Sequence, residues 1–184
     1  SVDDLKKNLN NRDFLIFDSR CDIKDSGYGI DSYTEGHIEN SIFIDVDTDL
    51  ASEKRPGTGR HPLPDATSFS EKLSHWGMSN NKQVVVYDDA GGAFAGRLWW
   101  MLKWLGHEAV AVLDGGLNSW VKDGNKLVTT PTIFEKSHFE ANVQENMIAT
   151  VKDVEEAQFK MNTILLDARS KERYEGINDP VDPI

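Results

Sequence analysis

One short pattern, present near each end of the chain, places the strongest constraint on the fold. Near the start, a segment with helical periodicity (residues 2–9) precedes the apolar run 14–17 and the tripeptide Asp18-Ser19-Arg20. Near the end, a similar segment (151–161) precedes the apolar run 164–166 and the tripeptide Asp167-Ala168-Arg169. Self-similarity of this kind indicates an internal duplication, in which each copy begins with a helix, a strand and an Asp-x-Arg turn.

The length of the chain fits one complete copy and part of another. Its 184 residues leave room for one domain of ordinary size, about 100–150 residues, and a remainder too short to fold alone. We expect a first domain over residues 1–125 and the beginning of a second domain over 148–184. Between them, hydrophobic periodicity disappears over 126–147, which is typical of a linker that crosses a domain surface.

Apolar runs and helical periodicity alternate along the first domain. The predicted buried strands are residues 14–17, 42–44, 84–87 and 109–113. The predicted helices extend from the cap Asp65 to Gly77, over 96–105 and over 117–122. This alternation predicts an α/β fold with a mostly parallel sheet. In the second copy, Thr150 and Asp153 resemble a capping box that opens a helix, and residues 163–166 are predicted as a strand.

Charge and cysteine content exclude several classes of function. The formal charge of −11 opposes binding to nucleic acid or to an anionic membrane, because both attract basic surfaces. The longest apolar runs are far shorter than the roughly 20 residues that cross a bilayer. Cys21 is the only cysteine, so the chain can build neither an internal disulfide nor a thiolate metal cluster. We therefore expect a soluble, cytoplasmic protein.

Two signatures resemble those of rhodanese domains. The first combines Asp18-Ser19-Arg20 with Tyr33-Thr34-Glu35-Gly36-His37-Ile38 and Ser41; the second is Leu113-Asp114-Gly115-Gly116-Leu117-Asn118-Ser119-Trp120. On these residues the chain is identified as a member of the tandem-domain rhodanese family, the thiosulfate and 3-mercaptopyruvate sulfurtransferases. The resemblance implies a rhodanese-like α/β domain over 1–125, with helices on both faces of its sheet, followed by an incomplete second rhodanese domain over 148–184.

The family's sulfur carrier is a cysteine after the strand that precedes the active-site loop, where backbone N–H groups and a helix N-terminus stabilise its thiolate. In this chain Asp88 stands at that position. A carboxylate cannot form a persulfide, and the loop over 88–97 is longer than the six-residue loop of active rhodanese domains. We therefore expect the first domain to be silent and the catalytic cysteine to lie beyond Ile184, so that the 184-residue chain is inactive on its own.

Three other residues match positions that the family uses around its cysteine. The resemblance implies that Arg173 grips the anionic donor, because a guanidinium forms paired hydrogen bonds with thiosulfate or carboxylate oxygens. It also implies that Asp47 fixes the tautomer of His61, which exchanges protons with a neighbouring thiol in the interdomain cleft. The alternatives are a solvated arginine at 173 and a loop histidine without a partner at 61.

The donor stays open between thiosulfate and 3-mercaptopyruvate. His61 and Asp47 favour 3-mercaptopyruvate. However, where that branch usually has a second arginine, this chain has Asp182, which would repel a carboxylate, so thiosulfate is slightly favoured. The implied acceptor is cyanide or a thiol such as thioredoxin, and the resemblance implies neither a metal nor an organic cofactor.

Other conspicuous residues are more simply explained by structure. We expect Asp18 and Arg20 to hold the strand end to neighbouring loops, and Asp167 and Arg169 to do the same in the second copy. Packing explains His37 and the tryptophans at 99, 100 and 104, and Cys21 lies on the wrong element to carry sulfur.

Two other classes of function are a nucleotide-binding protein and an inactive rhodanese-like module. Residues 91–96 have the glycine spacing of a phosphate-binding loop, but Arg97-Leu98 replaces its Lys-Ser/Thr pair. An inactive rhodanese-like binding or regulatory module is the stronger rival. The second Asp-x-Arg copy at Asp167 opposes that reading, because a free-standing module has no reason to begin another domain.

Overall fold

The computed structural model describes residues 1–178. Its chain divides into two compact units, Ser1–Gln144 and Glu145–Ile184.

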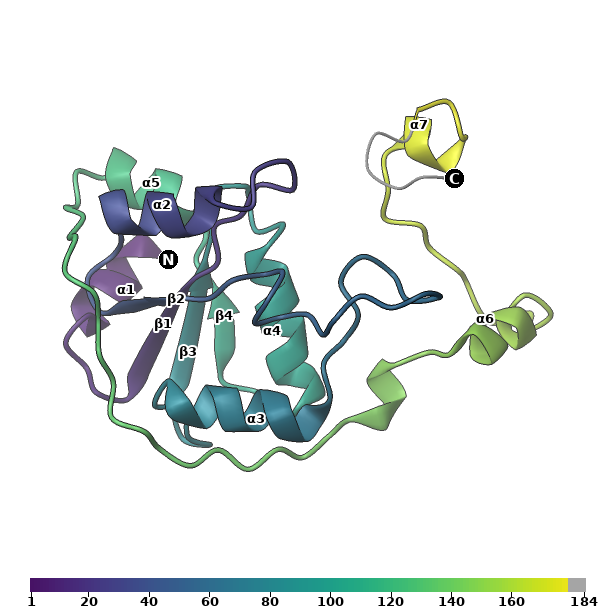
Figure 1. Cartoon of the computed structure of the whole chain (residues 1–184), viewed down its shortest axis with the longest axis horizontal. Coiled ribbons are helices and arrows are strands. Elements are labelled where there is room, and N and C mark those ends of the chain that lie inside the picture. Colours follow the sequence, from purple (N-terminus) through teal and green to yellow (C-terminus); the bar gives the residue numbers. More distant parts are fainter. Residues whose placement is uncertain (179–184) are drawn as a thin grey trace. The chain divides into compact units, whose positions relative to one another are not determined.

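A parallel sheet forms the centre of the first unit (Figure 1). Its described strands are β1 (Phe14–Asp18), β2 (Ser41–Phe43), β3 (Gln83–Tyr87) and β4 (Val110–Val112). They lie in the order β2-β1-β3-β4, and each neighbouring pair is parallel. The expected parallel α/β sheet is therefore confirmed, with strand ends within two residues of those predicted. Continuous apolar runs suit these strands because a parallel sheet is covered on both faces.

Helices cover both faces of this sheet, as expected (Figure 1). The helices of the first unit are α1 (Val2–Asn8), α2 (Tyr28–Glu35), α3 (Ala66–His75), α4 (Ala95–Trp104) and α5 (Gly116–Lys122). One core cluster joins Leu5 of α1 and Trp120 of α5 to Ile16 and Val85 of the sheet. Side chains alternate between the faces of a strand, so Phe17 points to the other face, where its ring meets the edge of Trp76 just after α3.

Local capping explains where two of these helices begin. Ser1 and Asp4 form a capping box at α1. Asp65 caps α3, as predicted, by accepting hydrogen bonds from the N–H groups of Thr67 and Ser68 at 3.0 Å each. Side-chain acceptors of this kind satisfy N–H groups that a helix leaves unpaired at its start. Helix α2 was not predicted, and its N-cap Gly27 supplies no side-chain hydrogen bond.

The carboxyl ends of β3 and β4 are held together by direct backbone contact. The N–H of Leu117 donates to the carbonyl oxygen of Asp88 at 2.8 Å. Gly116 has a φ of +56°, and a Cβ added there would lie 2.2 Å from the same oxygen. Glycine is therefore required at this position, because any side chain would push the two loops apart. This contact joins the second signature to the candidate site.

Residues 126–144 cross the surface of the first unit and pack against it. The backbone groups of His37 and Val128 exchange two hydrogen bonds of 2.9 Å. Further along, Asn80 and Glu140 exchange a side-chain-to-backbone pair, and Phe139 is buried. The irregular segment predicted from the loss of periodicity is thus tied to the rest of the first unit by hydrogen bonds at Val128 and Glu140.

The second unit contains short elements, and none of its described residues, 145–178, is buried. These elements are η1 (Glu145–Met147), α6 (Val151–Ala157) and α7 (Lys171–Tyr174). The predicted capping box of Thr150 and Asp153 is confirmed at α6, but the helix ends before residue 161. The predicted strand at 163–166 is wrong: these residues form no strand, and the side chains of Ile164 and Leu166 are 81% and 89% exposed. A strand needs a hydrogen-bonded neighbour, and none is present beside this segment among the described residues.

Across residues 1–178, no helix has the length and apolar character needed to cross a membrane.

Candidate active-site loop and its surroundings

The site is centred on the carboxylate of Asp88, directly after β3. Its Oδ1 accepts hydrogen bonds from the N–H groups of Ala90 and Gly92, at 3.0 and 2.8 Å. Its Oδ2 accepts from Phe94 and Ala95, each at 2.9 Å. The last two donors stand at the start of α4, where the helix dipole adds to the attraction for negative charge. The side chain of Asp88 is 1% exposed.

This arrangement determines what the loop can do chemically. The inward-facing N–H groups form a cradle for an anion, and the protein's own carboxylate fills it. These donors therefore point at Asp88 instead of at an external phosphate, which agrees with the rejection of a phosphate-binding loop. A carboxylate in this position cannot form a persulfide, so it cannot carry sulfur.

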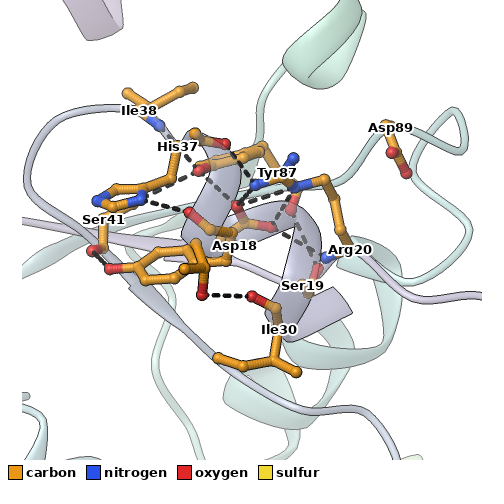
Figure 2. Close-up of polar contacts among 12 residues, drawn as sticks. Asp18, Ser19, Arg20, Ile30, His37, Ile38, Ser41, Tyr87 and Asp89 are labelled. Atoms are coloured by element: carbon orange, nitrogen blue, oxygen red, sulfur yellow. Dashed lines mark hydrogen bonds and ion pairs between the residues drawn. The ribbon is translucent and has the colours of Figure 1, made fainter. Parts of the chain in front are cut away.

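The aspartate and arginine of the first signature lie in a buried network beside this loop (Figure 2). Arg20 donates to both carboxylate oxygens of Asp18, with its shortest contact at 2.7 Å, and also to the carbonyl oxygen of Gly36 at 2.8 Å. The hydroxyl of Tyr87 donates to Asp18 at 2.8 Å. Burial, reinforced by the charge of Asp18, raises the pKa of Tyr87 well above its ordinary value, which keeps this hydroxyl protonated. The contacts agree with the structural role expected for Asp18 and Arg20.

His37 is enclosed by packing, as expected. Its ring stacks on Tyr33 with 3.8 Å between centroids. The two ring nitrogens lie 2.8 and 3.1 Å from the carbonyl oxygens of Tyr33 and Thr130. With its side chain fully buried, His37 joins α2 to the segment after α5 and has no access to a substrate.

The structure brings His61 and Asp47 together. The Nε2 of His61 lies 2.6 Å from Oδ1 of Asp47, and the two side chains are 20% and 41% exposed. His61 therefore has a partner, which removes the alternative of an unpaired loop histidine. Since the carboxylate is an acceptor, Nε2 is assigned as the protonated nitrogen, which leaves a lone pair on Nδ1.

Arg173 lies on α7 in the second unit, and Asp182 lies outside the described residues. The second Asp-x-Arg copy is also in this unit. Its Arg169 donates to both oxygens of Asp167, with the shortest contact at 2.6 Å. These hydrogen bonds lower the pKa of Asp167 to about 2. The Asp-x-Arg tripeptides of the two units thus adopt the same paired geometry, although the second pair is partly exposed, by 41% at Arg169 and 29% at Asp167.

Cys21 is a poor candidate for a nucleophile. Burial raises the pKa of its thiol to about 11, and the carboxylates of Asp47 and Asp45 add to the shift. The reactive form of a cysteine is the thiolate, so this thiol is almost entirely protonated at neutral pH. Within the described residues, no group of His, Cys, Asp and Glu side chains is arranged to hold a metal ion.

Two contacts around the loop were missed by sequence reasoning. The hydroxyl of Tyr28 donates to Asp89 at 2.5 Å, and the guanidinium of Arg97 donates to the carbonyl oxygens of Leu50 and His61. Both join residues far apart in the sequence, and the only available signal was the position of Asp89 and Arg97 on either side of the Gly-rich loop.

Comparison with known proteins identifies the rhodanese family. The profile of the rhodanese-like domain matches residues 1–123. Over 182 residues the chain is 37% identical to a probable 3-mercaptopyruvate sulfurtransferase of Pseudomonas aeruginosa, covering 98% of this chain and 64% of that protein. Over 156 residues it is 32% identical to the thiosulfate sulfurtransferase of Rattus norvegicus, covering 83% of this chain and 51% of the relative. The chain therefore spans about half to two thirds of these relatives.

A solved structure agrees with these similarities. The crystal structure of SseA from Escherichia coli, described as a 3-mercaptopyruvate sulfotransferase, matches with a TM-score of 0.83 at 27% identity. The match covers 98% of this chain and 69% of that structure.

Proposed function

The chain belongs to the rhodanese family, and from this premise we propose that its full-length protein is a sulfurtransferase using a cysteine persulfide. The catalytic thiolate attacks the outer sulfur of thiosulfate, a new S–S bond forms, and sulfite leaves with the electrons of the broken bond. Cyanide, or a thiol such as that of thioredoxin, then attacks the outer sulfur and restores the thiolate. With 3-mercaptopyruvate as the donor, pyruvate would leave in place of sulfite. No metal or organic cofactor is part of this proposal.

The observation that carries the proposal is the state of the Asp88 loop. The loop has the N–H donors that would stabilise a thiolate or persulfide, yet they are occupied by the carboxylate of Asp88. A family fold combined with a filled cradle is what we expect of a first domain that supports the reaction without performing it. Sulfur chemistry then requires a cysteine elsewhere in the protein.

We place that cysteine in a second domain that begins near residue 148 and continues beyond Ile184. The proposed boundaries are a non-catalytic domain over 1–125, a linker over 126–147 and the first part of the catalytic domain over 148–184. Support comes from the paired geometry of Asp167 and Arg169, which repeats that of Asp18 and Arg20. In this proposal Arg173 binds the oxygens of the donor anion, because its guanidinium offers paired donors to them.

His61 and Asp47 would support the reaction from the first domain. The 2.6 Å contact through Nε2 orients the imidazole and leaves Nδ1 as an acceptor. A histidine held in this way can take a proton from a thiol and later return it. In this proposal the pair acts as a proton relay for the thiol of the second domain.

The direct test uses the purified 184-residue chain with thiosulfate and cyanide. We expect no thiocyanate above the uncatalysed background. The longer protein with its second domain should form thiocyanate, and replacing the second domain's catalytic cysteine should abolish it. Cys21→Ser in the 184-residue chain is the control. Turnover by the wild-type chain that Cys21→Ser removes would overturn the assignment of the nucleophile to the second domain.

The filled cradle also fits a second candidate, an inactive rhodanese-like module for binding or regulation. Such a module would transfer no sulfur, either as the 184-residue chain or as the longer protein. The longer protein therefore separates the two functions: thiocyanate formation supports the sulfurtransferase, and its absence with both donors supports the module.

A further inference from the structure

The segment between β2 and α3 contains a loop whose two ends are tied together. The N–H of Ser52 donates to the carbonyl oxygen of Pro62 at 2.9 Å. Arg97 of α4 donates to Leu50 before the loop, at 2.9 and 2.6 Å, and to His61 at its end, at 3.1 Å. A surface loop with closed ends is an Ω-loop, a type that frequently carries function. Arg97 thus anchors the loop beside His61.

The tip of this loop is also ordered by its own contacts. The N–H of Thr58 donates to the carbonyl oxygen of Arg55 at 3.0 Å, and the N–H of Arg55 donates to the Thr58 hydroxyl at the same distance. Gly57 has a φ of +86° and follows Pro56. Proline and then glycine at the centre of such a turn are typical of type II. These hydrogen bonds fix the backbone of the turn from which the flanking side chains extend.

The charge of this loop is opposite to that of the chain. Lys54, Arg55 and Arg60 fall within it, whereas the whole chain carries −11. Glu53 partly offsets them through an ion pair of 3.6 Å with Arg55. Both partners are highly exposed, at 75% and 81%, so solvent weakens this pair and leaves the arginine available to another anion.

We propose that this loop, through Lys54 and Arg55, captures the small oxyanion that donates sulfur and delivers it beside the His61–Asp47 pair. The inference rests on the proposed function, in which the donor is an anion. A chain with a strong negative charge repels such a donor at long range, and a local cationic surface reverses that repulsion and raises its local concentration. The hydrogen bond from Ser52 to Pro62 ties the start of this cationic loop to the residue that follows His61, so both the cations and the histidine belong to one closed loop.

Binding is tested on the 184-residue chain by titrating the ¹⁵N-labelled protein with thiosulfate. We expect saturable shifts of the amide signals of Gly57, Thr58 and Gly59, with a millimolar dissociation constant. The double variant Lys54→Gln/Arg55→Gln should weaken binding about 5-fold or more, which corresponds to a total of about 1 kcal/mol from the two exposed cations. The matched control Lys122→Gln/Lys126→Gln removes the same charge elsewhere and should leave binding unchanged. Sulfate should compete with thiosulfate because it has the same charge and oxyanion surface.

Three results would overturn the proposal. The first is the absence of saturable shifts in the loop. The second is equal weakening in both double variants, which would indicate a general charge effect. The third is the same shifts with chloride at equal ionic strength, which would indicate an adventitious ion only. None of these results bears on thiocyanate formation by the longer protein, so failure of the loop proposal is distinguishable from failure of the proposed function.

Discussion

Replacing Asp88 by asparagine tests whether its carboxylate holds the active-site loop together. Asparagine has nearly the same shape, but one oxygen becomes an NH₂ group, which donates and cannot accept. In either orientation two backbone N–H groups then lose their acceptor: those of Ala90 and Gly92, or those of Phe94 and Ala95. An unsatisfied buried donor costs about 1–3 kcal/mol. The free energy of unfolding should therefore fall by about 2–6 kcal/mol.

Tryptophan fluorescence during urea unfolding is a suitable assay, because all five tryptophans lie in the first unit. A loss of about 4 kcal/mol in the free energy of unfolding, the middle of that range, corresponds to a fall in Tm of roughly 10 °C for a unit of this size. Asp89→Asn is the matched control: it removes the same charge from the neighbouring residue but keeps an oxygen to accept from Tyr28. We expect it to cost less than about 1 kcal/mol. Equal effects of the two substitutions would refute the idea that the cradle depends on the Asp88 carboxylate.

Two further predictions concern the surroundings of this loop. Arg20→Ala should reduce the free energy of unfolding by about 3–5 kcal/mol, because it leaves the buried carboxylate of Asp18 without its partner. Arg169→Ala removes the exposed copy of the same pair and should leave the tryptophan-reported transition unchanged; equal losses would contradict this explanation. For Cys21, the raised pKa of about 11 predicts that a thiol reagent at pH 8 labels the folded chain roughly 100-fold more slowly than the unfolded chain. The rate should rise with pH up to about 11, and rapid labelling at neutral pH would show that the thiol is not shielded.

The sequence predicted the sheet well because the information is local. The runs at 14–17 and 84–87 are apolar throughout, as both faces of the sheet require, and Asp65 marks the start of α3 by its capping chemistry. Helix α2 depends instead on contacts made far along the chain. A Cβ on Gly29 would lie 2.3 Å from the carbonyl oxygen of Arg20 and would also crowd the ring of Phe43. Such close packing cannot be read from the periodicity of residues 28–35.

The candidate site likewise has features that the sequence predicts and features that it does not. The prediction that Asp88 stands in the place of the family's cysteine rests on the resemblance of one strand and one loop. The filling of the cradle by its carboxylate depends on the directions of four N–H groups, which no residue pattern reports. The partnership of His61 and Asp47 was implied by resemblance, and the structure supplies the 2.6 Å contact. Arg97 gave only the signal of its position after the Gly-rich loop, because a guanidinium that binds backbone carbonyls requires no particular residue type in its partners.

The two Asp-x-Arg tripeptides show which part of their geometry is local and which part depends on the surrounding structure. In both copies the arginine forks onto the aspartate with nearly the same distances, so this geometry is set within the Asp-x-Arg turn. The two pairs differ in burial, since the side chains of Asp18 and Arg20 are 0% and 5% exposed. Asp18 also accepts from Tyr87, and Arg20 also donates to Gly36. These added partners come from β3 and from the end of α2. If residues 148–184 begin a second domain as proposed, its later segments should bury Asp167 and Arg169, which are 29% and 41% exposed in this structure.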